Sequence, residues 1–387
     1  MLVIITAVRR FSGPILGLLR HRWPTAFDRW PRVRPSISLF SLDSSLKALA
    51  MKAIAFTHCL PATDATALQD IELPQPQPGP HDLLVRVHAV SVNPIDTKVR
   101  RTAQPAEGQP RVLGWDAVGT VEALGPQASG FAVGDRVYYA GAINRPGSNS
   151  EWQLVDARIA AHAPRSLSDA QAAALPLTTI TAWELLFDRL GVSQGGGAGQ
   201  ALLIVGGAGG VGSMLIQLAR QLTQLRVVAT ASRPETVQWC RELGAHDVID
   251  HRQPLAEALR EQAGVAQVDL VTSLTQTDRH FTQIVELLAP QGRLALIDDP
   301  QAIDIRALKQ KSIALHWESM FTRSLFQTAD MPVQGQILAT VAKLVDEGRI
   351  RSTQRQHLGR ITAENLRQAH VLQESGTSIG KTVLEGF

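Results

Sequence analysis

The sequence predicts an α/β protein in which a β-rich domain precedes a doubly wound parallel sheet. Three observations lead to this prediction. Short alternating segments separated by Gly and Pro turns fill the chain up to residue 176, and buried strands that alternate with helices follow it. A glycine-rich turn joins one of these later strands to its helix. The 387 residues are enough for two or three domains with cores of their own.

We expect four segments along the chain. They are an extension over residues 1–50, a β-rich domain over 51–176, a parallel-sheet domain over 177–318 and a C-terminal return over 319–387. The extension holds eight Lys or Arg and two Asp, whereas the rest of the chain holds 30 basic and 33 acidic side chains. The mildly acidic body gives no electrostatic reason to expect nucleic-acid binding.

The basic extension has two interpretations. It is either a disordered addition, including one created by a start codon upstream of Met51, or an arginine-rich presequence with a targeting or membrane-surface role. Arg9, Arg10, Pro14 and Arg20 interrupt its apolar runs, so no run reaches the roughly 20 residues of a transmembrane helix. We favour the first interpretation and expect no membrane association.

The chain has only two cysteines, Cys59 and Cys240, and no CxxC pair. This excludes a disulfide framework and a cysteine-rich zinc site, and it favours a cytoplasmic location.

The β-rich domain is expected to hold short strands joined by turns. A proline-rich connection precedes the strand at 83–90, and that strand stops abruptly at "SVNPIDTK" (residues 91–98), because Pro94 cannot donate to a ladder. A helical stretch over 167–192, capped by Ser168, closes the domain. The other expected strands are 51–57, 117–125, 135–141 and 150–156.

The parallel-sheet domain is expected to alternate strands and helices. Its strands are predicted at 201–205, 226–231, 247–250, 269–274, 293–298 and 311–317. Helices are predicted at 211–222 and 234–244, and the C-terminal return adds helices at 336–348 and 364–376 and a strand at 381–387.

The glycine-rich turn predicts a dinucleotide-binding loop. The spacing GxGxxG falls at Gly207, Gly209 and Gly212, directly after a buried strand and at the start of an amphipathic helix. These glycines allow a tight turn, a close approach of the backbone to a pyrophosphate, and close packing of helix on strand. The loop also brings Gly210 and Val211 to the helix N-terminus, where free N–H groups attract phosphate.

The end of the second strand favours NADP(H) over NAD(H). A carboxylate is usual there for binding the ribose 2′-hydroxyl, but the sequence has Ser232 and Arg233, which suit a 2′-phosphate. The alternative is that Arg233 is only a solvated residue at a helix start. Thr272 and Leu274 end the fourth strand, where doubly wound sheets bind their ligand, so we expect them near the cofactor as well.

Several motifs resemble the medium-chain dehydrogenase/reductase superfamily, which combines a GroES-like catalytic domain with a Rossmann domain. They are "GWDAVGTVEALG" (residues 114–125), "VGDRVYYAG" (133–141) and "GGAGGVG" (206–212). The chain is similar to the zinc-free quinone oxidoreductase and enone reductase branch. It is most similar to "zinc-type alcohol dehydrogenase-like" proteins, which share "NPIDTK", "MFTRS" (320–324) and a final "GKTVLEGF".

The resemblance implies that no zinc is bound. Zinc alcohol dehydrogenases ligate the catalytic metal with two cysteines and a histidine, and the matching positions here hold Asn93, Trp115 and Leu177. These side chains do not make a tetrahedral zinc site. Without a Lewis acid to stabilise an alkoxide, the expected reaction is hydride transfer from NADPH to a quinone or an α,β-unsaturated carbonyl.

The resemblance also gives candidate catalytic residues. Asn93 corresponds to an asparagine near the nicotinamide ribose and the substrate, or it is only a capping amide. Lys98 stands where enone and alkenal reductases carry a lysine that would stabilise an enolate, or it is a solvated residue. Trp115 stacks on a planar substrate or fills the volume of the absent metal. For Asp96 we favour a helix cap, and for Asp116 a role in tying the loop together.

Further cofactor contacts follow from the same resemblance. Thr181 corresponds to a threonine that contacts the nicotinamide, and Phe321 and Arg323 of "MFTRS" are expected near its carboxamide. Lys381 is expected to be structural or to lie at the edge of the cofactor. A homodimer through the sheet edge at residues 312–317 also fits. Two other functions remain open, an alcohol dehydrogenase and a non-catalytic NADPH-binding sensor or structural protein.

Overall fold

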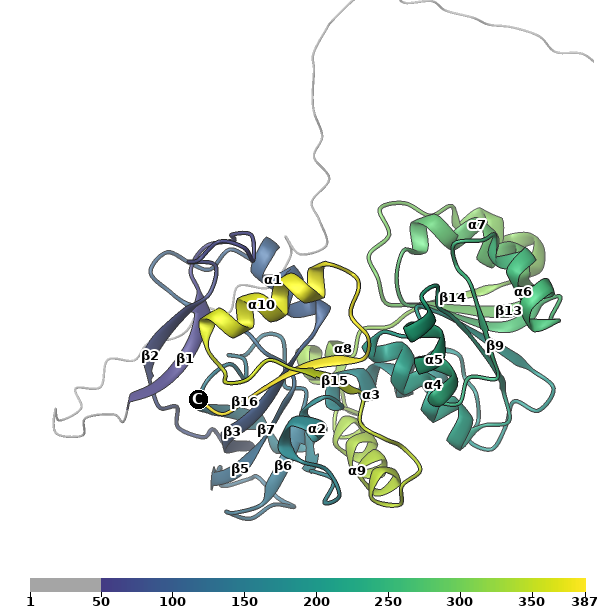
Figure 1. Cartoon of the computed structure of the whole chain (residues 1–387). Coiled ribbons are helices and arrows are strands. Elements are labelled where there is room, and N and C mark those ends of the chain that lie inside the picture. Colours follow the sequence, from purple (N-terminus) through teal and green to yellow (C-terminus); the bar gives the residue numbers. More distant parts are fainter. Residues whose placement is uncertain (1–49) are drawn as a thin grey trace, which may run out of the picture. The chain divides into compact units, whose positions relative to one another are not determined.

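The computed structural model describes residues 50–387 (Figure 1). The predictions for the extension therefore lie outside the described residues, apart from Ala50, which begins the first strand. Between residues 50 and 387, no helix has the length and apolar character that crossing a membrane requires.

The β-rich part consists of two sheets. A three-stranded sheet has the order β2-β1-β4, and a seven-stranded sheet has the order β15-β16-β3-β5-β6-β8, with β7 paired to β3. The C-terminal strand β16 runs antiparallel to β3 and pairs Thr382 with Val92, which places the start of β16 beside the end of β3. The strands are β1 Ala50–Phe56, β2 Gln69–Pro74, β3 Asp82–Val92, β4 Arg111–Val112, β5 Ala117–Leu124, β6 Arg136–Tyr139, β7 Trp152–Asp156, β8 Ala160–His162, β15 Gln354–His357 and β16 Lys381–Glu385.

The second part is a six-stranded sheet with the order β11-β10-β9-β12-β13-β14 in which every pairing is parallel. Its strand order reverses direction at β9, as in a doubly wound Rossmann sheet, so the predicted fold class is confirmed. The strands are β9 Ala201–Val205, β10 Arg226–Thr230, β11 Asp247–Ile249, β12 Val268–Ser273, β13 Leu288–Leu296 and β14 Ala314–Trp317. The helices between them are α4 Gly210–Leu222, α5 Pro234–Glu242, α6 Leu255–Ala263 and α7 Thr277–Leu287.

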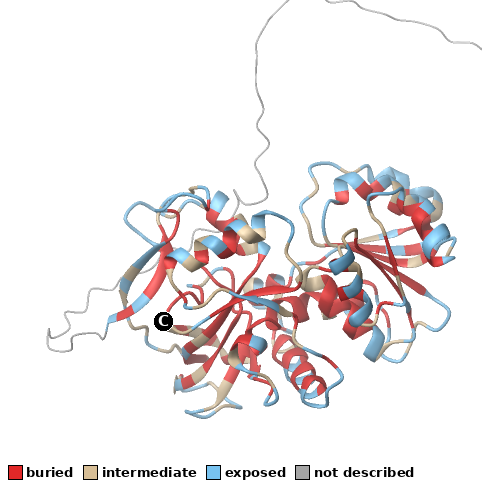
Figure 2. Ribbon diagram, in the orientation of Figure 1, coloured by how far each residue is buried: buried red, intermediate tan, exposed pale blue. Residues whose placement is uncertain are grey.

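Strand β9 shows why this sheet is buried on both faces. Leu202 and Ile204 pack into the large core that continues through the β-rich part, whereas Leu203 and Val205 pack into a second core. Successive side chains of a strand point to opposite faces, so the continuous apolar run places one core on each side. Figure 2 shows this burial along the strands of the sheet.

The predicted helix over residues 167–192 is wrong as a single helix. Ser168 does cap its start, where its hydroxyl accepts from the N–H of Gln171 at 3.2 Å, but the helix breaks before Pro176. Proline lacks an N–H and its ring clashes with the preceding turn, so it begins a new helix instead. The result is α2 Asp169–Ala173, α3 Pro176–Trp183 and the π-helical turn η2 Glu184–Arg189.

Four short strands, β2, β4, β8 and β15, have no counterpart in the predicted set. The expected proline-rich connection at 73–82 overlaps the end of β2, whose alternate residues are exposed. The remaining helical elements are α1 Pro94–Thr102, η1 Ala157–Ile159, η3 Ile305–Lys311, α8 Phe321–Phe326, α9 Val333–Asp346 and α10 Ala363–Glu374.

Candidate active site

The turn between β3 and α1 is built around Asn93, which precedes the helix in an extended conformation (φ −127°, ψ 160°). Its backbone N–H donates to Oδ2 of Asp96 at 2.8 Å, as expected for a capping role of Asp96. Pro94 occupies the first helical position, where a missing N–H costs nothing. Asp96 is fully buried, and this burial raises its pKa to about 7.

Both ends of the Asn93 carboxamide are engaged inside the protein. Its Nδ2 donates to Oδ2 of Asp116 at 2.8 Å, and its Oδ1 accepts from Nζ of Lys381. The side chain is 1% exposed. To contact ribose or substrate as predicted, Asn93 would have to use hydrogen-bonding positions of its carboxamide that Asp116 and Lys381 do not occupy.

Lys381 and Asp116 form a buried ion pair, with Nζ 3.2 Å from Oδ2. Nζ also donates to the carbonyl of Val92 at 2.7 Å, and Oδ1 of Asp116 accepts from the N–H of Leu177 at 2.7 Å. Burial lowers the pKa of Lys381 and raises the pKa of Asp116, and the opposite charge of each counteracts the shift of the other. Each group also has neutral hydrogen-bond partners, which favour the charged forms against burial. Asp116 thus connects the turn at Asn93, the start of α3 at Leu177 and strand β16 at Lys381, which agrees with the predicted role of tying the loop together.

Lys381 connects this pair to the phosphate loop. A Cβ on Gly210 would lie 2.8 Å from Cδ of Lys381, and Gly209 forms an isolated bridge with Gly380. The C-terminal return therefore borders the glycine loop.

The glycine loop itself fits a dinucleotide. A Cβ on Gly212 would lie 2.4 Å from the carbonyl oxygen of Gly206, so helix and strand pack too closely for any side chain there. Gly209 precedes α4 without a side-chain cap, and a Cβ there would meet nothing closer than 3.7 Å. Gly209 therefore leaves room for a pyrophosphate to approach the N-terminus of α4, where the N–H groups of Gly210 and Val211 begin the helix. Gly207 packs under β10, where its N–H donates to the carbonyl of Thr230 at 3.1 Å.

Ser232 and Arg233 follow β10 directly and are both partly exposed. The Arg233 guanidinium donates from Nη2 to the carbonyl of Thr377 at 2.7 Å, and its Nε lies 3.3 Å from Oε1 of Glu235. No carboxylate occupies residues 229–233. The two residues predicted to bind the 2′-phosphate therefore lie just beyond the carboxyl end of β10, as expected. Arg233 also contacts the C-terminal return.

Trp115 and Phe321 lie together, with ring centroids 6.0 Å apart and planes at 71°. Trp115 is 1% exposed, and its Nε1 donates to the carbonyl of Ala142 at 3.3 Å. Such a buried, internally bonded indole fills interior volume, which is the second of the two interpretations of Trp115.

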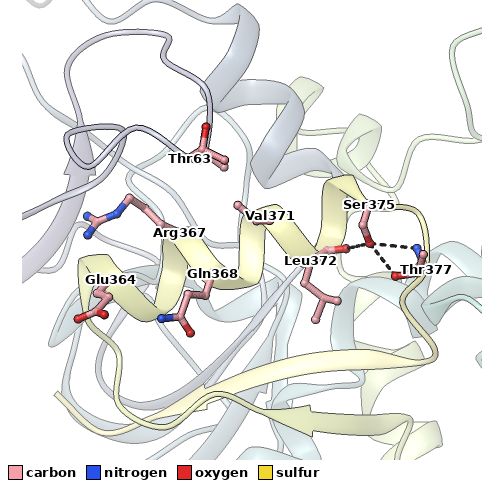
Figure 3. A pocket seen from close by; sticks show the side chains of 9 residues that line it. Thr63, Glu364, Arg367, Gln368, Val371, Leu372, Ser375 and Thr377 are labelled. Carbon is pink, nitrogen blue, oxygen red and sulfur yellow. Dashed lines mark hydrogen bonds between the residues drawn. The ribbon is translucent and has the colours of Figure 1, made fainter.

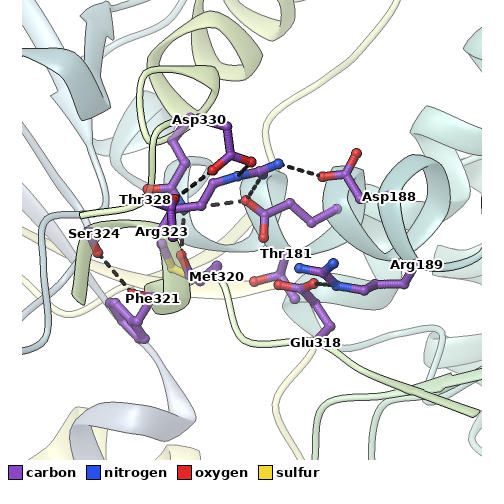
Figure 4. Close-up of polar contacts among 12 residues, drawn as sticks. Thr181, Asp188, Arg189, Glu318, Met320, Phe321, Arg323, Ser324, Thr328 and Asp330 are labelled. Atoms are coloured by element: carbon purple, nitrogen blue, oxygen red, sulfur yellow. Dashed lines mark hydrogen bonds and ion pairs between the residues drawn. The ribbon is translucent and has the colours of Figure 1, made fainter. Parts of the chain in front are cut away.

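Arg323 is held by three carboxylates (Figure 4). Its guanidinium contacts Glu184, Asp188 at 3.0 Å and Asp330 at 3.0 Å. Burial lowers the pKa of Arg323, but the carboxylates outweigh it and hold that pKa above its usual value. With its donors engaged in this way, Arg323 links η2 to α8; its predicted contact with the cofactor stays a prediction.

An ion pair between Arg189 and Glu318 lies next to this cluster. Oε2 of Glu318 accepts from Nε of Arg189 at 2.6 Å, while its Oε1 has no partner among residues 50–387. Burial, and then the charge of Glu184, raise the pKa of Glu318, whereas the Arg189 guanidinium acts in the opposite direction. The hydroxyl of nearby Thr181 donates to the carbonyl of Leu177 at 2.9 Å.

Lys98 lies apart from the buried pair. Its Nζ donates to Oδ2 of Asp299 at 2.8 Å, and the two side chains are 41% and 66% exposed. Asp299 follows the end of β13, so this pair joins the β-rich part to the carboxyl edge of the parallel sheet. Thr272 is fully buried with no partner for its hydroxyl in the described part of the chain, and Leu274 is partly exposed beyond the end of β12.

An open pocket of about 550 Å³ lies along α10. Thr63, Val371 and the hydroxyl residues Ser375 and Thr377 line it (Figure 3). None of the predicted site residues lines this pocket, although Thr377 also accepts the Arg233 hydrogen bond.

Sequence reasoning missed the central role of Lys381. The local signal is a lysine at the start of a strand with the apolar pair Val383 and Leu384, which is typical of a buried strand in which a charge needs a partner. Its partners, Asn93 and Asp116, lie more than 260 residues away in the chain.

The donor set around Asn93 does not fit a zinc ion. The residues at the expected ligand positions are an amide, an indole and an aliphatic side chain, and the Lys381 ammonium already binds the amide oxygen. Zinc sites use thiolate, imidazole and carboxylate ligands, and a fixed ammonium repels a metal cation. Over residues 50–387, no cluster of three His, Cys, Asp or Glu side chains has the arrangement of a metal site.

The two sheets of the β-rich part, the parallel sheet, the phosphate loop and the return of β16 define an oxidoreductase of the medium-chain dehydrogenase/reductase superfamily. Residues 79–164 match the model of the alcohol dehydrogenase GroES-like domain, and residues 243–384 match that of the zinc-binding dehydrogenases. A zinc-type alcohol dehydrogenase-like protein of Staphylococcus aureus is 40% identical over 339 residues, which cover 86% of this chain and 99% of that protein. The chain belongs to this family of zinc-type alcohol dehydrogenase-like proteins.

Solved structures agree with this assignment. A putative zinc-dependent alcohol dehydrogenase from Rhizobium etli is 54% identical, with a TM-score of 0.85 over 88% of this chain and 99% of that one. A mycobacterial protein complexed with NADPH is 29% identical, with a TM-score of 0.74 over 87% and 99% of the two chains. The quinone oxidoreductase of Coxiella burnetii is 27% identical, with a TM-score of 0.72 over 88% and 100%.

Proposed function

We propose that the protein is a zinc-independent, NADPH-dependent reductase of quinones or α,β-unsaturated carbonyls. The observation that carries the proposal is the Lys381 ammonium bound to Asn93 and Asp116, because Asn93 stands at a sequence position where the resemblance gives zinc-binding relatives a ligating cysteine. A charge fixed inside the protein in this way cannot act as a Lewis acid on an alkoxide. Acceptors that spread the incoming negative charge onto their own oxygen do not need such an acid.

The residues of the phosphate loop support the choice of cofactor. Bound NADPH would supply the hydride. Gly209, Gly210 and Val211 would bind its pyrophosphate, and Ser232 and Arg233 its 2′-phosphate. The NADPH complex of the mycobacterial relative supports the same choice.

The side chains of the β-rich part would orient the acceptor. Asn93 is held rigidly by two partners, so any hydrogen bond that it makes to a ligand has a fixed direction. Lys98 is an accessible cation of the helix that follows Asn93, and it would stabilise negative charge on a substrate oxygen after leaving Asp299.

The test measures NADPH oxidation with a panel of quinones and enones, and NADP⁺ reduction with simple alcohols. We expect turnover with members of the first panel and none with the second. Turnover of simple alcohols alone would contradict the proposal. NADPH binding without turnover on any acceptor would support a non-catalytic sensor instead.

A further inference from the structure

The segment that precedes β16 borders the phosphate loop. The N–H of Gly380 donates to the carbonyl of Ala208 at 2.9 Å, next to its bridge with Gly209. A Cβ on Gly380 would lie 2.9 Å from Cγ of Arg355. The side chain of Arg355, on strand β15, therefore lies directly beside the backbone segment that borders the phosphate loop.

An aromatic ring holds the Arg355 guanidinium in place. Its Cζ lies 4.8 Å from the ring centroid of Trp239 on α5. The indole is fixed in turn, because its Nε1 donates to the hydroxyl of Ser213 at 2.8 Å, in the first turns of α4. A guanidinium stacked on a fixed ring keeps its charge and its donors while it loses freedom of movement.

Arg355 differs from its neighbour Arg351 in its charge partners. Arg351 lies 4.9 Å from the same ring centroid, and its Nη2 is 3.2 Å from Oε2 of Glu242. Within residues 50–387, no carboxylate oxygen comes within 4.0 Å of the Arg355 guanidinium. Arg355 is exposed, and although Glu242 lies near enough to feel its charge, no ion pair engages its guanidinium.

Arg233 approaches the same segment through Thr377, four residues before Lys381. The charge of Arg233 is partly neutralised by Glu235, whose Oε1 lies 3.3 Å from Nε of Arg233. Residues 377–380 thus contact one arginine at Thr377 and another at Gly380. A phosphate monoester carries about 1.5 to 2 negative charges near neutral pH, more than one partly neutralised guanidinium balances.

We propose that Arg355 is a second binding residue for the 2′-phosphate of NADP(H) and determines, together with Arg233, the preference for this cofactor. This inference rests on the proposed function. The guanidinium of Arg355 would donate to the phosphate oxygens from the side of the C-terminal return, with Trp239 fixing its plane.

The test compares the dissociation constants of NADPH and NADH, measured by nucleotide fluorescence for the full-length chain. Arg355→Gln should weaken NADPH binding at least about tenfold, the loss expected for one charge-assisted hydrogen bond, and leave NADH binding unchanged. Arg351→Gln, at the same ring, is the matched control and should change neither constant. Arg355→Lys should retain part of the preference because it keeps the charge.

Two outcomes separate the failure of this inference from that of the proposed function. If the unaltered chain binds NADH as tightly as NADPH, the cofactor assignment itself is wrong. If it prefers NADPH, and Arg233→Gln removes that preference while Arg355→Gln does not, the assignment stands and the role of Arg355 is refuted. An equal weakening of NADPH and NADH by Arg355→Gln would also refute it, because that change would not involve the 2′-phosphate.

Discussion

The buried pair of Lys381 and Asp116 predicts a strong energetic coupling between β16 and the loop before α3. Lys381→Met keeps the methylene stem that packs on Gly210 but leaves the Asp116 carboxylate without its counter-charge. Both side chains are at most 4% exposed, so water cannot replace the lost partner. Each single substitution, Lys381→Met or Asp116→Asn, should cost about 3–5 kcal/mol of the free energy of unfolding.

The double variant should be more stable than the sum of the two losses implies. With both charges gone, no uncompensated charge remains inside, and we expect a coupling energy of at least about 2 kcal/mol. Urea unfolding followed by tryptophan fluorescence measures the four free energies. Lys343→Met is the control, because that lysine is 78% exposed and only 3.8 Å from Glu347, and it should leave stability unchanged. Strictly additive losses would refute the ion pair.

Three further predictions concern other charged groups. Because burial raises the pKa of Asp96 to about 7, the folded chain keeps a proton that the unfolded chain loses near pH 4. The stability of the unaltered chain relative to Asp96→Asn should therefore fall by about 2 kcal/mol from pH 5 to pH 7 in urea titrations, and a constant difference would contradict the burial argument. Glu184→Gln should cost about 3 kcal/mol in the same assay because it breaks the Arg323 contact. Glu318→Gln should cost less, because burial and the charge of Glu184 raise the pKa of Glu318 and favour its neutral form; the reverse order would show that Glu318 carries the charge. Lys98→Met should lower kcat/KM for an enone at least about tenfold, while Asp299→Asn, which frees the ammonium, should not; equal losses would mean that the pair acts only as a link.

Local patterns in the sequence predicted most of the fold. Glycine spacing and the change from short alternating segments to buried strands and helices identified the phosphate loop and the parallel sheet. The strands that were missed are two to six residues long, and most take their geometry from partners distant in the chain. The break at Pro176 was readable from the residue itself, since proline starts helices more readily than it continues them.

The site was less predictable because its contacts are not local. Asn93 and Lys381 are 288 residues apart and meet only because β16 pairs antiparallel with β3. The resemblance predicts that Arg323 lies near the nicotinamide carboxamide, but nothing local in the sequence shows that two of its carboxylate partners, Glu184 and Asp188, lie on the π-helical turn η2. A burial pattern predicts that a charge needs a partner, but only the tertiary structure shows which partner it has.

Zinc independence is tested most directly by metal analysis and turnover measurements on one preparation of the full-length chain. Zinc content and NADPH-dependent reduction of a quinone or enone are measured before and after exhaustive chelation. A zinc-independent reductase should contain no stoichiometric zinc, and its turnover should be unchanged after chelation. Stoichiometric zinc whose removal abolishes the activity would contradict zinc independence.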